Sequence, residues 1–397
     1  MGETFWWGGL AVAAGCVAYA YIGYPAVLWI LAPLGRSRPD PPVPDEWPAI
    51  TIVLPVYNEE HVIAETLESI LALDYPEDRR HVLVISDAST DGTDAIVEQY
   101  ADRGVELVRL AERGGKTAAE NAARSHLRGD IVVNTDASVR LRRDALKPLI
   151  AAFGDPTVGV ASGRDVSIGH GTMTANVGEA GYVGYEMWIR GLETRVRGIV
   201  GASGCFFASR AELHREIVPE ALSRDFAAPL IAQEHGYRSV SVNDAVCFVP
   251  RADSLRLEYR RKVRTMTRGL ATLFYKRNLL NPIRHGTFAW MLWSHKLARW
   301  LVPWATVVGG VAAVSLAFSH PWLWWVVGLA ALVPTLAIVG WLWPSGGHTP
   351  TLLAVPTYGF FGMVAGLHAW IEAIGGNAAP TWKPTRRTPH SVDVSSH

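Results

Sequence analysis

Acidic side chains stand directly after several short apolar runs in the amino-terminal part of the chain. Glu59 follows the first run, Asp87 the second and Asp136 the fourth. Each alone can have a purely structural role, because Asp and Asn often cap helices or form turns. Carboxylates that meet at one place can instead hold a hard divalent cation or act as a general base. The pattern therefore indicates such chemistry, provided that the apolar runs lie side by side.

The apolar runs have the length and the β-branched composition of buried strands, and amphipathic stretches separate them. Strands and helices that alternate at this spacing predict an α/β domain with a mostly parallel sheet and helices on both faces. Ligands of such sheets bind beyond the carboxyl ends of the strands, which is where the acidic residues stand. The predicted strands are residues 50–56, 81–85, 105–110 and 131–133, and a helix is predicted at 116–127.

Two long uncharged segments indicate that part of the chain lies in a lipid bilayer. Of 397 residues, 49% are hydrophobic, 19% are charged and 16 are Trp. Asp, Glu, Lys and Arg are absent from residues 4–35 and 301–371, and Pro321 and the run 344–350 divide the second segment into three. Each piece approaches the roughly 20 residues that cross the hydrocarbon core. We expect one amino-terminal anchor and three carboxy-terminal spans.

A cleaved signal peptide and a buried helix bundle fit these segments less well than membrane spans do. Only Glu3 precedes the first segment and no A-x-A site stands out, which argues against a signal peptide. The later segments lack the polar faces of a buried helix bundle. The formal net charge is zero, so we expect no nucleic-acid partner, and three scattered cysteines argue against a disulfide framework or a zinc site.

Basic residues set the expected orientation. Arg36 and Arg38 place the end of the anchor in the cytosol, but four crossings would leave Lys383, Arg386 and Arg387 outside, against the positive-inside rule. Either the last segment does not cross fully or the tail is an exception. A basic, aromatic-rich stretch before the second uncharged segment suits helices on the inner leaflet. The expected units are an anchor (1–35), a Pro-rich linker (36–49), a cytosolic domain (50–254), interfacial helices (255–300), spans (301–373) and a tail (374–397).

Several short motifs, in this order and spacing, resemble the inverting family 2 glycosyltransferases, whose membrane-bound members include cellulose, hyaluronan and chitin synthases. The motifs lie within residues 50–270 and are PVYNE (55–59), SDASTDGT (86–93), GGK (114–116), NTDAS (134–138), GASG (201–204), RDF (224–226) and a basic stretch (261–269). The resemblance implies a GT-A fold, which is α/β and Rossmann-like, with transmembrane and interfacial α-helices. It also implies an enzyme of the bacterial inner membrane that moves a sugar from a nucleotide sugar, which we expect to be a UDP-sugar, to a saccharide or lipid-linked acceptor. The product would be a cell-surface polysaccharide or a glycolipid.

The resemblance also assigns roles to individual residues. Asp225 would be the catalytic base, and Asp136 with Ser138 would carry Mg²⁺ or Mn²⁺. The nucleotide would be bound by Pro55, Tyr57, Glu59, Asp87, Lys116 and Asp136. The acceptor and the diphosphate would be contacted by Gly201, Ser203, Gly204, Arg261, Arg264 and Arg268.

The chain departs from the family pattern at three places. Arg224 stands where the family often has an acidic residue, although Asp225 is retained. Ser138 stands where the metal motif usually has a second Asp, and a hydroxyl is a poorer ligand, so metal affinity is expected to be lower. The basic stretch lacks the Gln-x-x-Arg-Trp motif of processive synthases, so transfer of one or a few sugars competes with polymerisation as the prediction. A catalytically silent nucleotide-sugar sensor and a transporter are the other classes. A base argues against the sensor, and spans without ionisable residues other than His argue against the transporter.

Overall fold

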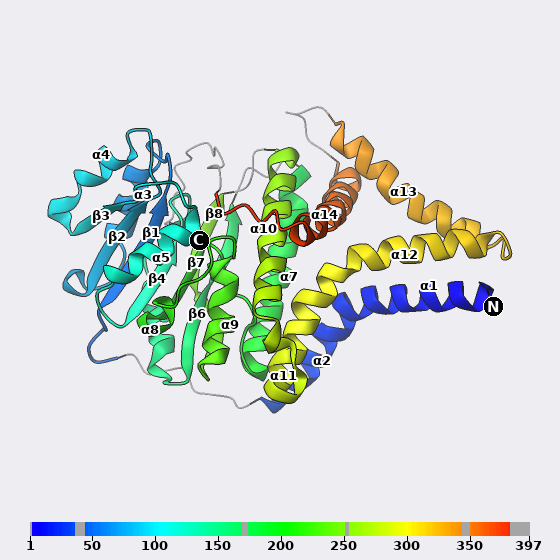
Figure 1. Cartoon of the computed structure of the whole chain (residues 1–397), viewed down its shortest axis with the longest axis horizontal. Coiled ribbons are helices and arrows are strands. Elements are labelled where there is room, and N and C mark those ends of the chain that lie inside the picture. Colours follow the sequence, from blue (N-terminus) through cyan, green and yellow to red (C-terminus); the bar gives the residue numbers. More distant parts are fainter. Residues whose placement is uncertain (1, 36–43, 169–173, 251–253, 344–349, 382–397) are drawn as a thin grey trace.

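A computed structural model describes residues 2–35, 44–168, 174–250, 254–343 and 350–381, with side chains from residue 181 onward in the helix that begins at Thr174. The basic residues that set the expected orientation, namely Arg36, Arg38, Lys383, Arg386 and Arg387, lie outside these ranges. Two parts can be distinguished in Figure 1, a sheet covered by helices and a group of long apolar helices beside it.

The first half of the sheet is parallel, as the alternating pattern predicts. It consists of β1 (Ile50–Val56), β2 (Arg80–Ser86), β3 (Val105–Arg109) and β4 (Ile131–Thr135), in the order β3-β2-β1-β4. Every residue of β1 and β4 is buried, because helices cover both faces of a parallel sheet. The connecting helices are α3 (Ile63–Leu71), α4 (Thr93–Glu98) and α5 (Lys116–Ala122). The predicted helix at 116–127 is shorter in the structure, where a 3₁₀ turn at Ala123–Ser125 ends it.

The second half of the sheet mixes strand directions. Strand β7 (Phe206–Arg210) is antiparallel to both β4 and β6 (Val158–Ile168), and β6 pairs in parallel with β8 (Arg238–Pro250). The short β5 (Arg140–Leu141) pairs antiparallel at the outer edge of β8. The eight strands follow the order β3-β2-β1-β4-β7-β6-β8-β5. The antiparallel β7 turns the chain around once, so β6 and β8 again point in the same direction as β1, β2 and β4.

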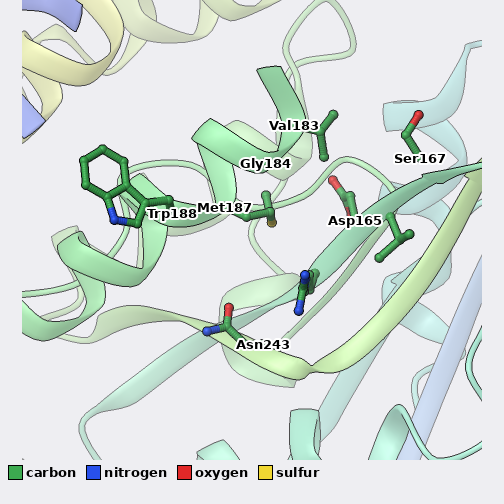
Figure 2. A pocket seen from close by; sticks show the side chains of 9 residues that line it. Asp165, Ser167, Val183, Gly184, Met187, Trp188 and Asn243 are labelled. Atoms are coloured by element: carbon green, nitrogen blue, oxygen red, sulfur yellow. The ribbon is translucent and has the colours of Figure 1, made fainter. Parts of the chain in front are cut away.

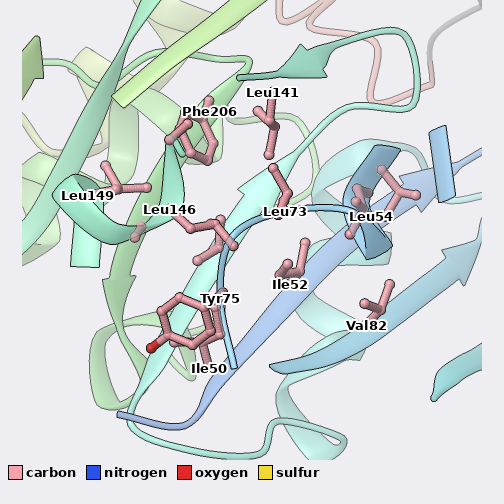
Figure 3. Close-up of a cluster of buried hydrophobic side chains, with 14 of the residues drawn as sticks. Ile50, Ile52, Leu54, Leu73, Tyr75, Val82, Leu141, Leu146, Leu149 and Phe206 are labelled. Carbon is pink, nitrogen blue, oxygen red and sulfur yellow. The ribbon is translucent and has the colours of Figure 1, made fainter. Parts of the chain in front are cut away.

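This topology gathers the ends of several strands along one edge of the sheet. The carboxyl ends of β1, β2, β4, β6 and β8 lie there together with the amino end of the antiparallel β7. The core beneath the edge is apolar and continuous. Figure 3 shows Ile50, Ile52 and Leu54 of β1 in the same cluster of buried side chains as Leu146 of α6 (Leu146–Ala151) and Phe206 of β7. Loops that leave this edge are thus mounted on a rigid base.

Three further helices complete the domain, and two of them border the apolar helices. Helix α9 (Arg224–Glu234) follows the short α8 (Ala211–His214), and α7 (Thr174–Val196) crosses from β6 toward the amino-terminal helices. Side chains of α7 and α9, among them Ile189 and Phe226, share an apolar cluster with Tyr24 and Met291 of the apolar part. The two parts are therefore packed together rather than linked by a flexible hinge.

Within the described ranges, four helical segments are long and apolar enough to cross a membrane, the number that the sequence predicts. They are Gly2–Leu34, Pro282–Ala317, Leu323–Trp341 and Thr351–Ile374. The first contains α1 (Gly2–Ala18), a π-helical turn (Tyr19–Gly23) and α2 (Tyr24–Leu31), and the second contains α11 (Pro282–Leu292), a π-helical turn (Trp293–Ala298) and α12 (Arg299–Ala317). In Figure 1, α1 and α12 run side by side away from the sheet, and α13 (Leu323–Trp341) folds back toward it.

The last apolar helix has two kinds of neighbour. Helix α14 (Thr351–Ile374) packs against α13 on one side and against α10 (Leu255–Tyr275) and α7 on the other. Helix α10 is the basic amphipathic helix that the sequence predicts, and in the structure it fills the space between α14 and the sheet domain (Figure 1).

Candidate functional site

The end of β2 is fixed to the turn that begins α5 by one buried carboxylate. Asp87 is fully buried, and its oxygens accept hydrogen bonds from the backbone N–H of Gly114 at 2.7 Å and of Gly115 at 3.0 Å. Gly115 has φ +94°, a left-handed conformation that favours glycine. The GGK motif is therefore a turn shaped by Asp87, which places Lys116 at the start of α5.

A stacked pair that the sequence did not reveal lies beside Asp87. The guanidinium carbon of Arg113 is 3.6 Å from the centroid of the Tyr57 ring, and its Nε is 3.9 Å from an Asp87 oxygen. Tyr57 was predicted as a nucleotide contact, whereas Arg113 was missed. The sequence does place a cation, Arg113, directly before the GGK turn. That position could have indicated a residue near Asp87, which follows β2 at the same edge of the sheet.

The loops after β1 and β2 hold each other in place. Asn58 and Ala88 both have positive φ, +53° and +56°. The Asn58 N–H donates to Ser89 Oγ at 3.2 Å, and the Glu59 N–H donates to Thr93 Oγ1 at 2.8 Å. These bonds place Glu59 directly beyond β1, while Pro55 lies within β1 opposite Ile85 of β2.

Asp91, the other acidic residue of the second motif, has a structural role. It accepts hydrogen bonds from the Thr93 N–H at 3.0 Å and the Thr93 hydroxyl at 2.5 Å, so it shapes the turn that begins α4. Burial acts against the charged form, but these bonds outweigh it and lower the pKa of Asp91. An Asp before Gly-Thr fits either the start of a helix or a role in the chemistry, and the geometry gives Asp91 a turn-forming role, with Gly92 at the N-cap position of α4.

Lys116 joins the end of β4 to the loop before β7. Its Nζ lies 2.5 Å from Asp136 Oδ1 and donates to the Gly204 carbonyl oxygen at 2.9 Å. Burial acts to lower the pKa of Lys116, but the carboxylate of Asp136, helped by Glu120 and Asp225, raises it above its ordinary value. The ammonium group therefore stays charged, and it neutralises the carboxylate that was predicted to bind the metal ion.

Asp225 lies on the other side of the same glycine. The Ser223 hydroxyl donates to Asp225 Oδ1, and a Cβ added to Gly204 would lie 2.9 Å from Asp225 Oδ2. Gly204 thus contacts Lys116 through its carbonyl group and Asp225 through its bare Cα. The structure brings Asp136, Lys116, Gly204 and Asp225 into one group, at the edge where Asp87 holds the GGK turn.

Ser203 anchors the predicted acceptor loop to β6. Its N–H donates to Ser162 Oγ at 2.8 Å, and its hydroxyl donates to Asp165 Oδ1 at 2.5 Å. Ser203 is fully buried, so it positions the loop. Gly201, at the start of the loop, lies beside Lys296, whose Cε would be 3.0 Å from an added Cβ. Asp165 was not predicted, because only the register between β6 and β7 brings it to this edge.

The three predicted arginines of α10 have different surroundings. Arg268 is buried, donates to Thr117 Oγ1 at 2.7 Å and to the carbonyl oxygen of Leu222, and so ties α5 to the loop before α9. Arg261 is paired with Glu258 of its own helix at 2.8 Å, and Arg264 is half-buried one turn before Arg268. Of the three, Arg268 is the one whose described contacts reach the site.

The chain after α14 returns to the GGK turn. Arg268 also donates to the Pro380 carbonyl oxygen at 3.2 Å, and a Cβ added to Gly115 would collide with that same carbonyl group. A segment more than 250 residues away in the sequence thus covers the turn that carries Lys116. Nothing in the sequence around Pro380 predicted this contact.

The predicted metal site contains few protein ligands. In the part of the chain that the structure describes, no three His, Cys, Asp or Glu side chains are grouped so that they could hold a metal ion. Asp136, with Ser138 two residues later, supplies hard oxygen donors at the end of β4. Mg²⁺ and related ions are commonly bound by one or two carboxylates, substrate phosphates and water. The residues therefore fit a cation that arrives with a phosphorylated ligand.

A pocket of about 450 Å³ opens between β6, β8 and α7. Its polar lining residues are Arg164, Asp165 and Ser167 of β6 and Asn243 of β8, and Met187 and Trp188 of α7 line an apolar side. Figure 2 shows Trp188 at one end and Asp165 with Ser167 at the other. The pocket thus reaches the anchored loop at its Asp165 end.

Comparisons with known proteins agree with this geometry. Residues 51–218 match the model of glycosyl transferase family 2. Over 124 residues the chain is 32% identical to an N-acetylglucosaminyltransferase of Bradyrhizobium elkanii, a stretch that covers 30% of this chain and 68% of that protein. Over 123 residues it is 33% identical to a β-monoglucosyldiacylglycerol synthase of Synechocystis sp.. That match covers 30% of this chain and 26% of the relative, so the chain spans about a quarter of the length of that protein.

A solved structure resembles almost the whole chain. It is a mannosyltransferase from Pyrobaculum calidifontis in complex with GDP-mannose and Mn²⁺. It is 26% identical in sequence, has a TM-score of 0.68 and covers 92% of this chain and 99% of its own. The likeness extends beyond the sheet domain, because such coverage must include most of the apolar helices.

Proposed function

Because this chain belongs to glycosyl transferase family 2 and has the GT-A fold, we propose that it is a membrane-integrated, inverting glycosyltransferase that uses a nucleotide sugar as donor. The single observation that carries the proposal is the convergence of Asp136, Lys116 and Asp225 on Gly204. These residues come from three separate elements, and the proposed reaction needs each of their charges.

The nucleoside part of the donor would lie at the ends of β1 and β2. Tyr57 and Arg113 offer stacked planar faces, and Asp87 is a hydrogen-bond acceptor next to them. We propose a UDP-sugar as donor, as the family resemblance led us to expect. The relatives named N-acetylglucosaminyltransferases support this choice, whereas the mannosyltransferase structure contains GDP-mannose. A panel of donors is therefore needed to test the base as well as the sugar.

The diphosphate would lie between the GGK turn and Asp136. Lys116, which stays charged, would form charge-assisted hydrogen bonds with the phosphates. Asp136, with Ser138, would hold a divalent cation, Mg²⁺ or Mn²⁺, and the Mn²⁺ bound to the related mannosyltransferase supports this proposal. When bound, the cation would stabilise the negative charge of the departing nucleoside diphosphate.

Asp225 would act as the base for the acceptor. The acceptor hydroxyl oxygen forms a bond to the anomeric carbon while the bond from that carbon to the diphosphate breaks. The proton of the hydroxyl passes to the Asp225 carboxylate, and the bonding electron pair leaves with the nucleoside diphosphate. One displacement of this kind inverts the anomeric configuration. Asp225 lies against Gly204, on the side opposite Lys116, and this position supports its role as the base.

We further propose that the four apolar segments place the enzyme in the bacterial inner membrane with the sheet domain in the cytosol. A cytosolic site has access to nucleotide sugars, and the bilayer gives access to lipid-linked acceptors. The products would be a cell-surface polysaccharide or a glycolipid.

The proposal is tested with the purified full chain in nanodiscs, a panel of UDP- and GDP-sugars, and Mg²⁺, Mn²⁺ or EDTA. We expect metal-dependent release of the nucleoside diphosphate together with a glycosylated product that mass spectrometry detects. Nucleotide-sugar binding without release or product would instead support a silent sensor, and the Asp225 assignment would then be wrong.

A further inference from the structure

The pocket between β6, β8 and α7 belongs to no role assigned so far. None of its lining residues was predicted to bind the nucleotide or the metal ion or to act as the base, and none belongs to the sequence motifs. Its volume of about 450 Å³ falls in the range of small-molecule sites, roughly 300–1,000 Å³. It is therefore large enough for a ligand of its own.

A short series of contacts joins the pocket to the reacting groups. Asp165 at one end of the pocket accepts the hydrogen bond of Ser203. The next residue, Gly204, contacts the Asp225 carboxylate on one side and binds Lys116 on the other. Ser203 and Gly204 thus connect the Asp165 end of the pocket to the proposed base, Asp225.

The strand order places the pocket on the side away from the nucleoside. Asp87 and Tyr57 follow β2 and β1, Asp136 follows β4, and the pocket lies on β6 and β8. Along this edge the metal carboxylate therefore stands between the nucleoside end and the pocket. A group in the pocket would approach the anomeric carbon from the face opposite the diphosphate, as an inverting displacement requires.

The two sides of the pocket suit a sugar ring, which has polar hydroxyl groups at its rim and C–H groups on its faces. Both described hydrogen bonds of Asp165, from Ser203 and from Cys247, go to Oδ1, so Oδ2 can accept from a ligand hydroxyl. Asn243 adds an amide from β8, and Trp188 presents an indole ring that is 48% exposed. Aromatic rings bury a large apolar area at a small entropic cost, which is the usual way to bind an apolar face.

We propose that this pocket is the acceptor site and binds a saccharide, with the reacting hydroxyl at the Asp165 end and the sugar chain directed toward Trp188. This inference rests on the proposed function and makes it more specific, because it selects a glycosyl acceptor rather than a lipid phosphate or a protein. The saccharide can be free or joined to a lipid, and the test separates these two sources.

The experiment measures transfer from the accepted nucleotide sugar to methyl and dodecyl glycosides that carry one or two sugar units. We expect Trp188→Ala to raise the acceptor KM on the order of 10-fold or more, a loss of about 1.4 kcal/mol per factor of ten, with the donor KM unchanged. Trp188→Phe should restore most of the affinity, and Asn243→Ala should raise the acceptor KM independently. A preference for dodecyl over methyl glycosides would identify a lipid-linked saccharide as the source.

Tyr182 provides a matched control. It lies on α7, is 48% exposed like Trp188, and does not line the pocket, so Tyr182→Ala should leave the acceptor KM unchanged. Unchanged acceptor KM values in both Trp188→Ala and Asn243→Ala would overturn the acceptor site while the proposed function stands. Transfer to a lipid phosphate or a protein but to no saccharide would also overturn it. If the wild type transfers to nothing, the proposed function fails, and calorimetric titration with the same glycosides still decides whether the pocket binds sugars.

Discussion

The Lys116 ammonium group lies 2.5 Å from the Asp136 carboxylate, the group that we expect to bind the divalent cation. A lysine and a divalent cation cannot both occupy the same side of one carboxylate oxygen. Lys116 must therefore release Asp136 when a metal-bound diphosphate enters, and its positive charge is then available for the phosphates.

This relationship predicts opposite effects of one substitution. Lys116→Met should strengthen the binding of Mn²⁺ alone by a small factor, because a partly exposed ion pair is worth only about 0.2–1 kcal/mol. The same variant should bind the nucleotide sugar more weakly, since a hydrogen bond to a charged group contributes about 1.5–3 kcal/mol. Calorimetric titration with Mn²⁺ alone measures the affinity for the metal ion, and titration with the donor at saturating Mn²⁺ measures the affinity for the nucleotide sugar. Asp136→Asn is the control and should weaken both affinities. Weaker Mn²⁺ binding in Lys116→Met would contradict the competition.

A second prediction concerns the base. Asp225→Asn keeps the size of the side chain but removes its ability to take a proton, so kcat should fall by roughly 10²–10⁴-fold. The donor Kd should stay within a few-fold, because the carboxylate faces Gly204 on the acceptor side. Transfer kinetics and donor titration measure the two quantities. Ser223→Ala, which removes only the hydroxyl that holds Asp225, should cause a smaller loss. Undiminished transfer by Asp225→Asn would remove Asp225 from the mechanism.

Local patterns were sufficient for much of the fold. The run ITIVLPV becomes β1 at Ile50–Val56, as predicted, because a β-branched, continuously apolar segment is stable only where both faces are buried. In the part of the chain that the structure describes, the apolar segments form four helices of spanning length for a similar reason, since their composition suits lipid on every side. Asp87 and Asp136 lie at strand ends because a parallel sheet aligns those ends whatever the loops do.

Contacts between segments that are distant in the sequence could not be predicted from local patterns. Arg113 stacks on Tyr57 across 56 residues, and Ser203 reaches Asp165 across 38 residues. Both contacts depend on strand pairing, and the reversal at β7 that brings β6 to the same edge has no local signature. The contact of Pro380 with Arg268 depends on the path of α14 in the same manner. Residues that position the site therefore escaped prediction more often than residues that carry recognisable chemistry.

A third prediction concerns stability as a function of pH. His214 is buried, its Nε2 lies 3.1 Å from Asn134 Oδ1, and burial, helped by the nearby Arg224 cation, lowers its pKa well below the ordinary value. Below about pH 6.5 the His214 imidazole is protonated in the unfolded chain but stays neutral in the folded protein. The free energy of unfolding should therefore fall as the pH falls. The slope is at most about 1.4 kcal/mol per pH unit.

His214→Gln isolates this contribution, because the glutamine can donate to Asn134 but does not titrate. We expect the unfolding temperature of the wild type in detergent to drop more steeply between pH 7 and pH 5 than that of His214→Gln. The comparison of the two slopes cancels other titrating groups, such as His81, whose pKa burial also lowers. Parallel slopes would show that the pKa of His214 is the same in the folded and the unfolded chain.

The last prediction uses two glycines of one loop that differ in what surrounds them. A Cβ at Gly204 would lie 2.9 Å from Asp225 Oδ2, and Asp225 has a short side chain already held by Ser223, so Gly204→Ala should push the carboxylate out of position. A displacement of about 1 Å at a reacting group can cost on the order of 10²-fold in rate, and we expect a loss of that size in kcat with an unchanged unfolding temperature. A Cβ at Gly201 would instead meet the end of the long Lys296 side chain, with Cε at 3.0 Å, which can move aside. Gly201→Ala should therefore retain most of the activity. Equal losses in the two variants would mean that the loop, rather than the position of Asp225, limits the reaction.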